Sequence, residues 1–186
     1  MKNLEIKLSG FGGQGIVLAG YILGKAASLY DKKNATLTQS YGPESRGGAC
    51  SAQVVISEEE VDYPEVLDPD ILVTMSKEAY DKYLPNLKAN GILLYDEDLV
   101  ENNKVLSDSN KAYAIPATRF AEELGRKIVA NIIMLGFLTS ITRIIKQDSM
   151  KKAIENSIPK GTEELNLTAF QRGYDYGVNI LKAMAK

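Results

Sequence analysis

Two glycine-rich segments hold the residues whose types and spacing could bind a ligand. The first, residues 10–15, reads Gly-Phe-Gly-Gly-Gln-Gly and stands between an alternating stretch, 4–8, and an apolar run from Ile16. This order predicts a strand, a tight turn and a helix. Glycines allow a ligand to approach the backbone closely, and the unpaired N–H groups at a helix start favour a phosphate. This glycine turn is therefore a candidate anion-binding site.

The second segment, residues 42–48, reads Gly-Pro-Glu-Ser-Arg-Gly-Gly and follows a predicted strand. Arg46 is a permanent cation whose planar guanidinium suits phosphate or carboxylate. The alternative is a solvated surface pair of Glu44 with Arg46, which would contribute little free energy. If the strands before the two segments run parallel, both segments lie at one edge of the sheet, where α/β proteins bind ligands. We favour this functional interpretation, because loops on rigid sheets often carry function.

The spacing Gly10-x-Gly12-x-x-Gly15 also matches the dinucleotide-binding fingerprint. That fingerprint requires an acidic residue at the end of the second strand, where it binds a ribose hydroxyl. Residues 38–41 occupy this place and read Thr-Gln-Ser-Tyr. A self-contained NAD enzyme is therefore disfavoured, and a turn that merely packs the helix on the strand is its plain alternative.

The composition excludes several kinds of chemistry. The 186 residues contain no histidine and one cysteine, Cys50, so a histidine-based triad, a histidine metal site and an iron–sulfur cluster lack their ligands. A net charge of −2 provides no basic field for nucleic acid, and no apolar run is long enough to cross a bilayer. With no signal peptide and a lone cysteine, we expect a cytoplasmic protein.

Strand-like and helical patterns alternate along the chain. Strands are predicted over 4–8, 35–41, 49–57, 70–75, 91–96 and 111–115, with a further short strand near Val61. Helices are predicted over 16–30, 77–83, 116–124, 129–146 and 163–183, and a short one, capped by Asp148 or Ser149, up to residue 157. The pattern predicts one α/β domain over residues 1–186: a three-layer, Rossmann-like, mainly parallel sheet with helices on both faces and a helical C-terminal third.

Several segments together resemble the γ subunit of 2-oxoacid:ferredoxin oxidoreductases. They are the glycine turn with its helix, 10–27, the second loop, 41–48, the run Val-Ala-Asn-Ile-Ile-Met-Leu-Gly, 129–136, and two C-terminal stretches, 158–160 and 166–174. The likeness extends over nearly the whole chain. The second loop looks closer to subunits of the 2-oxoglutarate type than to those of the indolepyruvate type.

This resemblance implies one part of an enzyme. Such complexes decarboxylate a 2-oxoacid, here 2-oxoglutarate, on thiamine diphosphate, pass electrons through iron–sulfur clusters to ferredoxin, and transfer the acyl group to coenzyme A. The thiamine diphosphate, its Mg and the clusters are expected on partner subunits, α and β, with a δ subunit left open. The chain is expected to hold no metal, cofactor or catalytic residue of its own. It should be inactive in isolation, and it should self-associate through apolar surface meant for its partners.

By the same resemblance, the glycine turn and the second loop form part of the wall of the cofactor and coenzyme A site. The predicted site residues are Gly12, Gly13, Gln14, Gly15, Glu44, Ser45, Arg46, Gly47 and Asn131. Gln14 is expected to bind a ligand or a partner subunit, and Asn131 is open between a cap beside the site and a plain helix-start residue. Two other functions stay open: a stand-alone nucleotide- or coenzyme A-binding module, and a purely structural subunit.

Overall fold

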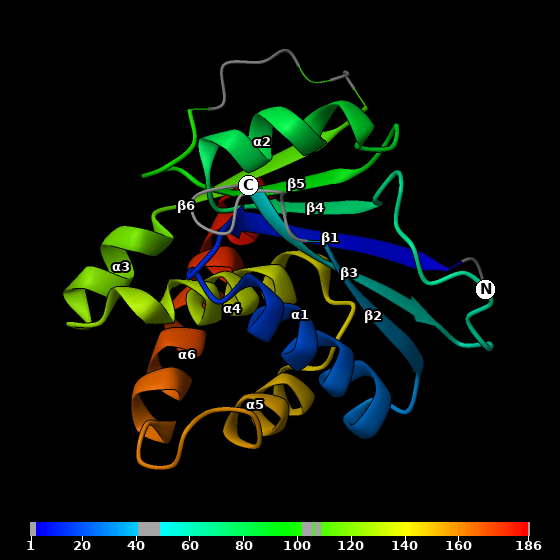
Figure 1. The fold of residues 1–186 in the computed structure, drawn as a ribbon. Coiled ribbons are helices and arrows are strands. Elements are labelled where there is room, and N and C mark those ends of the chain that lie inside the picture. Colours follow the sequence, from blue (N-terminus) through cyan, green and yellow to red (C-terminus); the bar gives the residue numbers. More distant parts are fainter. Residues whose placement is uncertain (1–2, 41–48, 102–105, 107–108, 186) are drawn as a thin grey trace.

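One mixed sheet runs through the molecule (Figure 1). The computed structural model describes residues 3–40, 49–101, 106 and 109–185, and within these ranges six strands lie in the order β2-β3-β1-β4-β5-β6. The strands are β1 (Leu4–Phe11), β2 (Asn34–Ser40), β3 (Ala49–Ser57), β4 (Ile71–Thr74), β5 (Ile92–Asp96) and β6 (Lys111–Ile115). β1, β4, β5 and β6 are parallel, whereas β3 is antiparallel to both β1 and β2. The prediction of an α/β fold with a mainly parallel sheet is confirmed.

The central strands form because both of their faces are covered. All four residues of β4 are buried, which is typical of a parallel strand between two layers of helices. In the middle of the sheet Leu8 lies opposite Val73 on one side and Ala52 on the other. All described strands belong to this one sheet, while the prediction of a single domain over residues 1–186 stays a prediction.

Helices cover both faces of the sheet unequally (Figure 1). α2 (Lys77–Tyr83) and the 3-10 turn η2 (Leu84–Asn86) pack over one face, where Tyr80 contributes to a small buried cluster with Leu72 and Leu93. The other helical segments are α1 (Ile16–Lys25), its π-helical continuation η1 (Ala26–Tyr30), α3 (Ala117–Glu123), η3 (Lys127–Val129), α4 (Ala130–Thr142), α5 (Gln147–Glu155) and α6 (Glu163–Met184). No helix in the described ranges is long and apolar enough to cross a membrane.

The C-terminal helix α6 packs closely against α4, which is buried along most of its length. Glycines on both helices allow this approach. A Cβ atom at Gly136 would collide with the carbonyl oxygen of Phe170, and one at Gly173 would collide with the carbonyl oxygen of Ile133. The backbones of the two helices are therefore in contact, and α6 fixes the position of α4.

Three expectations from the sequence are wrong in detail. No strand forms near Val61; the chain there is a loop held by the buried Val66, whose N–H donates to the side chain of Gln53 over 2.6 Å. α4 ends at Thr142 rather than near residue 146, because Arg143 takes a left-handed conformation with φ of 54°. α5 begins after Lys146, and neither expected residue is its cap.

Candidate functional site

The glycine turn, residues 10–15, lies at the carboxyl ends of the parallel strands, where β1 ends. Gly15 is the N-cap of α1 with φ of 73°, and Gly13 has φ of 98°. Both values fall in the left-handed region that side chains with a Cβ rarely adopt, so glycine is required at these two positions. The N–H of Gln14 donates to the carbonyl oxygen of Phe11 over 3.2 Å and closes the turn. The predicted order of strand, turn and helix is confirmed.

The side chain of Gln14 connects the ends of two neighbouring strands. Its Oε1 accepts a hydrogen bond from the N–H of Phe11 over 2.7 Å, and its Nε2 donates to the carbonyl oxygen of Met75 over 2.8 Å. Phe11 is the last residue of β1, and Met75 follows β4 directly. A Cβ atom at Gly10 would collide with this Oε1. Gln14 therefore joins the carboxyl ends of the central strands β1 and β4. Its predicted contact with a ligand or partner stays a prediction.

Asn131 reaches the same turn from α4. Its side chain is 3% exposed, its Nδ2 donates to the carbonyl oxygen of Gly15 over 3.1 Å, and its Oδ1 accepts from the N–H of Ile132 over 2.8 Å. The N-cap of α4 is Val129, so the interpretation of Asn131 as the helix cap is wrong. Asn131 lies in the first turn of the helix, and it joins that helix to the glycine turn.

Two cavities open on either side of the turn. The first has a volume of about 340 Å³ and is bordered by Gly13, Gln14, Thr118 and Lys127. The second, of about 390 Å³, is bordered by Gly15, Asn131, Arg126 and mostly apolar side chains between residues 158 and 165. Ile128 borders both. Each cavity thus combines an apolar wall with one basic side chain, which suits an anionic ligand with an apolar part.

Residues 126–128, which lie between the two cavities, were not among the predicted site residues. They belong to the short connection of α3 to α4, and Ile128 is 60% exposed. Lys127 pairs with Glu122 over 2.6 Å on the surface. The signal available in the sequence was a basic pair directly after Gly125, between the predicted helices 116–124 and 129–146.

A buried carboxylate supports the wall of the first cavity. Asp96, at the end of β5, is fully buried, and its Oδ2 accepts from the N–H of Thr118 over 3.0 Å and from its hydroxyl over 2.6 Å. The N–H of Asp98 donates to the other oxygen over 3.2 Å. Burial raises the pKa of Asp96 above its ordinary value of 3.8, although the hydrogen bonds from Thr118 and Asp98 oppose this shift. Asp96 therefore fixes the start of α3.

This pKa shift predicts how stability depends on pH. Because the folded pKa of Asp96 lies above the unfolded value, its contribution to stability is fully present below pH 3.8 and is lost as pH rises through the folded pKa. The variant Asp96→Asn lacks this titration. Urea unfolding between about pH 3 and about pH 7 should show the stability of the wild type falling relative to that of the variant. A constant difference would contradict the assignment.

The second predicted site segment, residues 42–48, is not among the described residues. Glu44, Ser45, Arg46 and Gly47 lie outside the described residues. From the sequence, the two segments were expected at the same end of the sheet if the strands that precede them run parallel. These strands, β1 and β2, do run in the same direction, because both are antiparallel to β3. β2 ends at Ser40, and β3 begins at Ala49, which pairs with Phe11 next to the glycine turn.

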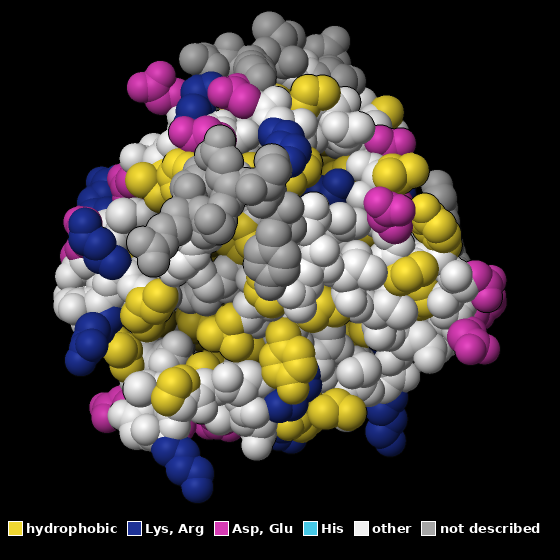
Figure 2. Space-filling model, viewed as in Figure 1, with side chains coloured by type: hydrophobic (Ala, Val, Ile, Leu, Met, Phe, Trp, Pro, Cys, Tyr) yellow, Lys and Arg dark blue, Asp and Glu magenta, His cyan; other side chains and the backbone are white. Residues whose placement is uncertain are grey.

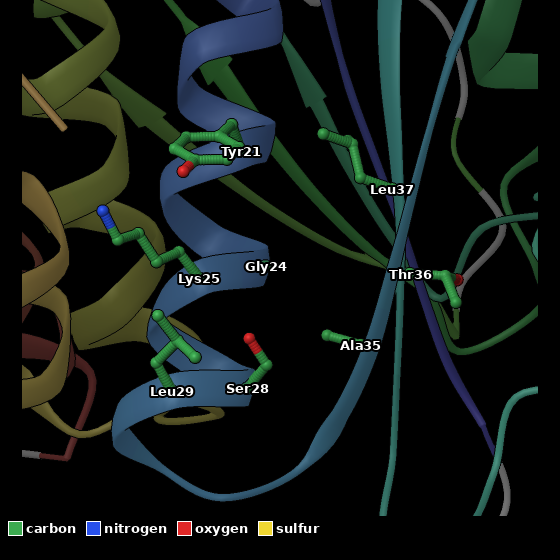
Figure 3. Close-up of a pocket in the computed structure, with 8 residues that line it drawn as sticks. All are labelled: Tyr21, Gly24, Lys25, Ser28, Leu29, Ala35, Thr36 and Leu37. Carbon is green, nitrogen blue, oxygen red and sulfur yellow. The ribbon is translucent and has the colours of Figure 1, made fainter.

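A third cavity, of about 250 Å³, lies between α1–η1 and the edge strand β2 (Figure 3). Ala35 and Leu37 point from the strand towards the helix. The side chain of Lys25 points away from the strand. The Nζ of Lys25 donates to the carbonyl oxygen of Asn156 over 2.7 Å, so this cation serves the contact with the end of α5. None of the described residues predicted for the site borders this cavity.

The family model described as pyruvate ferredoxin/flavodoxin oxidoreductase matches residues 5–176 of this chain. The chain belongs to this family. A family relative, the 2-oxoglutarate synthase subunit KorC of Methanocaldococcus jannaschii, is 59% identical over 172 residues, which are 92% of either chain. The family predicted from the motifs is thereby confirmed.

Two solved structures share this fold. The γ subunit of a keto/oxoacid ferredoxin oxidoreductase from Geobacter sulfurreducens matches with a TM-score of 0.86 and 40% identity, over 96% of this chain and 98% of that one. The 2-oxoglutarate:ferredoxin oxidoreductase of Magnetococcus marinus, solved with 2-oxoglutarate, coenzyme A and succinyl-CoA bound, matches with a TM-score of 0.84 and 23% identity. The match covers 95% of this chain but 31% of that one. There the same fold is one part of a longer polypeptide.

Proposed function

We propose that this chain is the γ subunit of a 2-oxoglutarate:ferredoxin oxidoreductase complex and has no activity by itself. The observation that carries the proposal is the 59% identity with a 2-oxoglutarate synthase subunit over 92% of both chains. The complex would convert 2-oxoglutarate and coenzyme A into an acyl-CoA and pass electrons to ferredoxin. Among the described residues no group of three or more His, Cys, Asp or Glu could hold a metal ion. Thiamine diphosphate, Mg and the iron–sulfur clusters are proposed to lie on the α and β partners, as the family resemblance implies.

The part of the chain proposed to meet coenzyme A is the glycine turn with the first cavity. Coenzyme A is strongly anionic, and the first turn of α1 contains no acidic residue that would oppose an anion. Lys127 borders the first cavity, where it also pairs with Glu122, and Arg126 adds positive charge at the second cavity. The Magnetococcus enzyme, which contains the same fold, binds coenzyme A. The second loop, with Glu44 to Gly47, is proposed to complete this wall.

An apolar surface is proposed to contact the larger subunit of the complex. Figure 2 shows hydrophobic side chains gathered on the face that carries α1, and Leu18, Tyr21 and Ile128 are exposed by 36%, 49% and 60%. Leu18 and Ile128 border the same cavity. In the Magnetococcus enzyme the matched fold is covalently joined to the rest of a longer chain. For subunits made as separate chains, association would rest on noncovalent burial of apolar surface.

Calorimetry on the free chain separates this proposal from a stand-alone nucleotide-binding module. NAD, NADP and coenzyme A should each bind the free chain weakly or not at all, because the chain is proposed to supply one wall of the site. Micromolar binding of NAD by the free chain would favour the module instead. Coenzyme A should bind once the partner subunits are present.

A further inference from the structure

The glycines of residues 10–15 are of two kinds. Gly10 and Gly15 are each faced by a side-chain amide, because a Cβ atom at Gly10 would collide with Oε1 of Gln14 and one at Gly15 with Nδ2 of Asn131. Gly12 and Gly13 are different, since a Cβ atom at either position would meet no other atom within 4 Å. Side-chain amides of the protein thus occupy the space beside the first and last glycines of the fingerprint, Gly10 and Gly15. The space beside Gly12 and Gly13 is open.

The amide at the first end fixes the turn to the sheet. The two hydrogen bonds of Gln14 reach backbone atoms at the ends of β1 and β4. Those ends are already in register, because the N–H of Met75 donates to the carbonyl oxygen of Ser9 over 2.8 Å. A side chain held at both its oxygen and its nitrogen cannot rotate freely, so Gln14 keeps the residue before Gly12 in place.

The amide at the other end fixes the turn to the helical layer. Asn131 bonds the carbonyl oxygen of Gly15, 116 positions away in the sequence, from the first turn of α4. α4 is itself held by the close backbone contact with α6 at Gly136 and Gly173. The glycine turn is therefore attached to two rigid bodies, the sheet at one end and the α4–α6 pair at the other.

We infer that Gln14 and Asn131 are positioning residues, which clamp the glycine turn so that the backbone of Gly12 and Gly13 is preformed to receive coenzyme A. This inference rests on the proposed function for the identity of the ligand. In this inference Gly10 and Gly15 have a different role from the one that the dinucleotide fingerprint gives them. They leave room for the amides of Gln14 and Asn131 and do not serve the close approach of a dinucleotide. A preformed wall lowers the ordering cost of binding and so lowers KM for the co-substrate.

The test uses the assembled complex carrying Gln14→Ala or Asn131→Ala. Each variant should raise KM for coenzyme A by about tenfold and leave kcat and KM for 2-oxoglutarate within about twofold. The matched control is Gln147→Ala, which removes another side-chain amide bond, from Gln147 to Gln171 over 3.1 Å, and should change none of these constants. An unchanged KM for coenzyme A in both clamp variants would overturn the inference. A wild-type complex that turns over without coenzyme A would overturn the proposed function instead.

Hydrogen exchange of the full chain provides a second measurement that does not depend on activity. Gln14→Ala should accelerate exchange of the Phe11 N–H by at least about tenfold, because its acceptor is lost, while exchange along α1 stays as in the wild type. Gly10→Ala should also accelerate exchange of the Phe11 N–H, because the added Cβ would displace the side chain of Gln14. In the Gln14→Ala background the same substitution should cause no further acceleration. Unchanged exchange at Phe11 in Gln14→Ala would show that the amide does not hold the turn.

Discussion

Gly173→Ala is expected to lower the free energy of unfolding by about 3 kcal/mol, the upper part of the range for overpacked interiors. The added Cβ would collide with the carbonyl oxygen of Ile133 and lie 3.1 Å from the backbone nitrogen of Phe137. These are helical backbone atoms, which cannot rotate away as a side chain can. The α4–α6 pair would have to separate, and Asn131 would move with α4. Urea unfolding of the full chain measures the loss.

Gly24→Ala is the matched control for this prediction. Gly24 also lies in a helix, but a Cβ there would meet no other atom within 4 Å. This substitution should stabilise the chain by about 0.5–1 kcal/mol, because alanine has the higher helix propensity. If Gly173→Ala behaved like Gly24→Ala, the close contact between α4 and α6 would be refuted.

The double variant Leu18→Glu/Ile128→Glu is expected to abolish assembly with the larger subunit. Two carboxylates would be placed in the apolar surface proposed as the interface, where burial of a charge without a partner is strongly unfavourable. Both side chains are exposed in the free chain, so its own fold should be retained. Co-expression with the larger subunits, followed by affinity purification of this chain, should recover at least about tenfold less partner than the wild type does.

Leu67→Glu controls for a general effect of added negative charge. Leu67 is 62% exposed, lies in the loop between β3 and β4, and borders neither of the two cavities beside the glycine turn. Its substitution should leave recovery of the partner unchanged. Equal recovery with the double variant and the wild type would mean that another surface makes the contact.

Local patterns in the sequence were enough for most of the fold. The range 77–83 for α2 is correct, because Ser76 accepts a hydrogen bond from the N–H of Ala79, as an N-cap serine does. The glycine turn was predicted for a similar reason, since alternation, glycines and an apolar run follow one another within a few residues. Such signals depend only on neighbours in the chain.

The details that were missed depend on contacts between distant residues. The bond from Asn131 to Gly15 spans 116 positions, and the one from Gln14 to Met75 spans 61, so no local pattern reports either. The strand expected near Val61 fails for the same reason, because Gln53 binds the loop at Val66 instead. Ligand contacts of the predicted site residues stay predictions, with Glu44, Ser45, Arg46 and Gly47 outside the described residues.

The most direct test is an omission assay on the reconstituted complex. Reduction of ferredoxin by 2-oxoglutarate and coenzyme A is measured with the larger subunits alone, with this chain alone, and with both together. The account predicts no turnover by this chain, a rate at least about tenfold lower for the larger subunits without it, and restoration when it is added. Turnover by this chain alone, or an undiminished rate without it, would contradict the account.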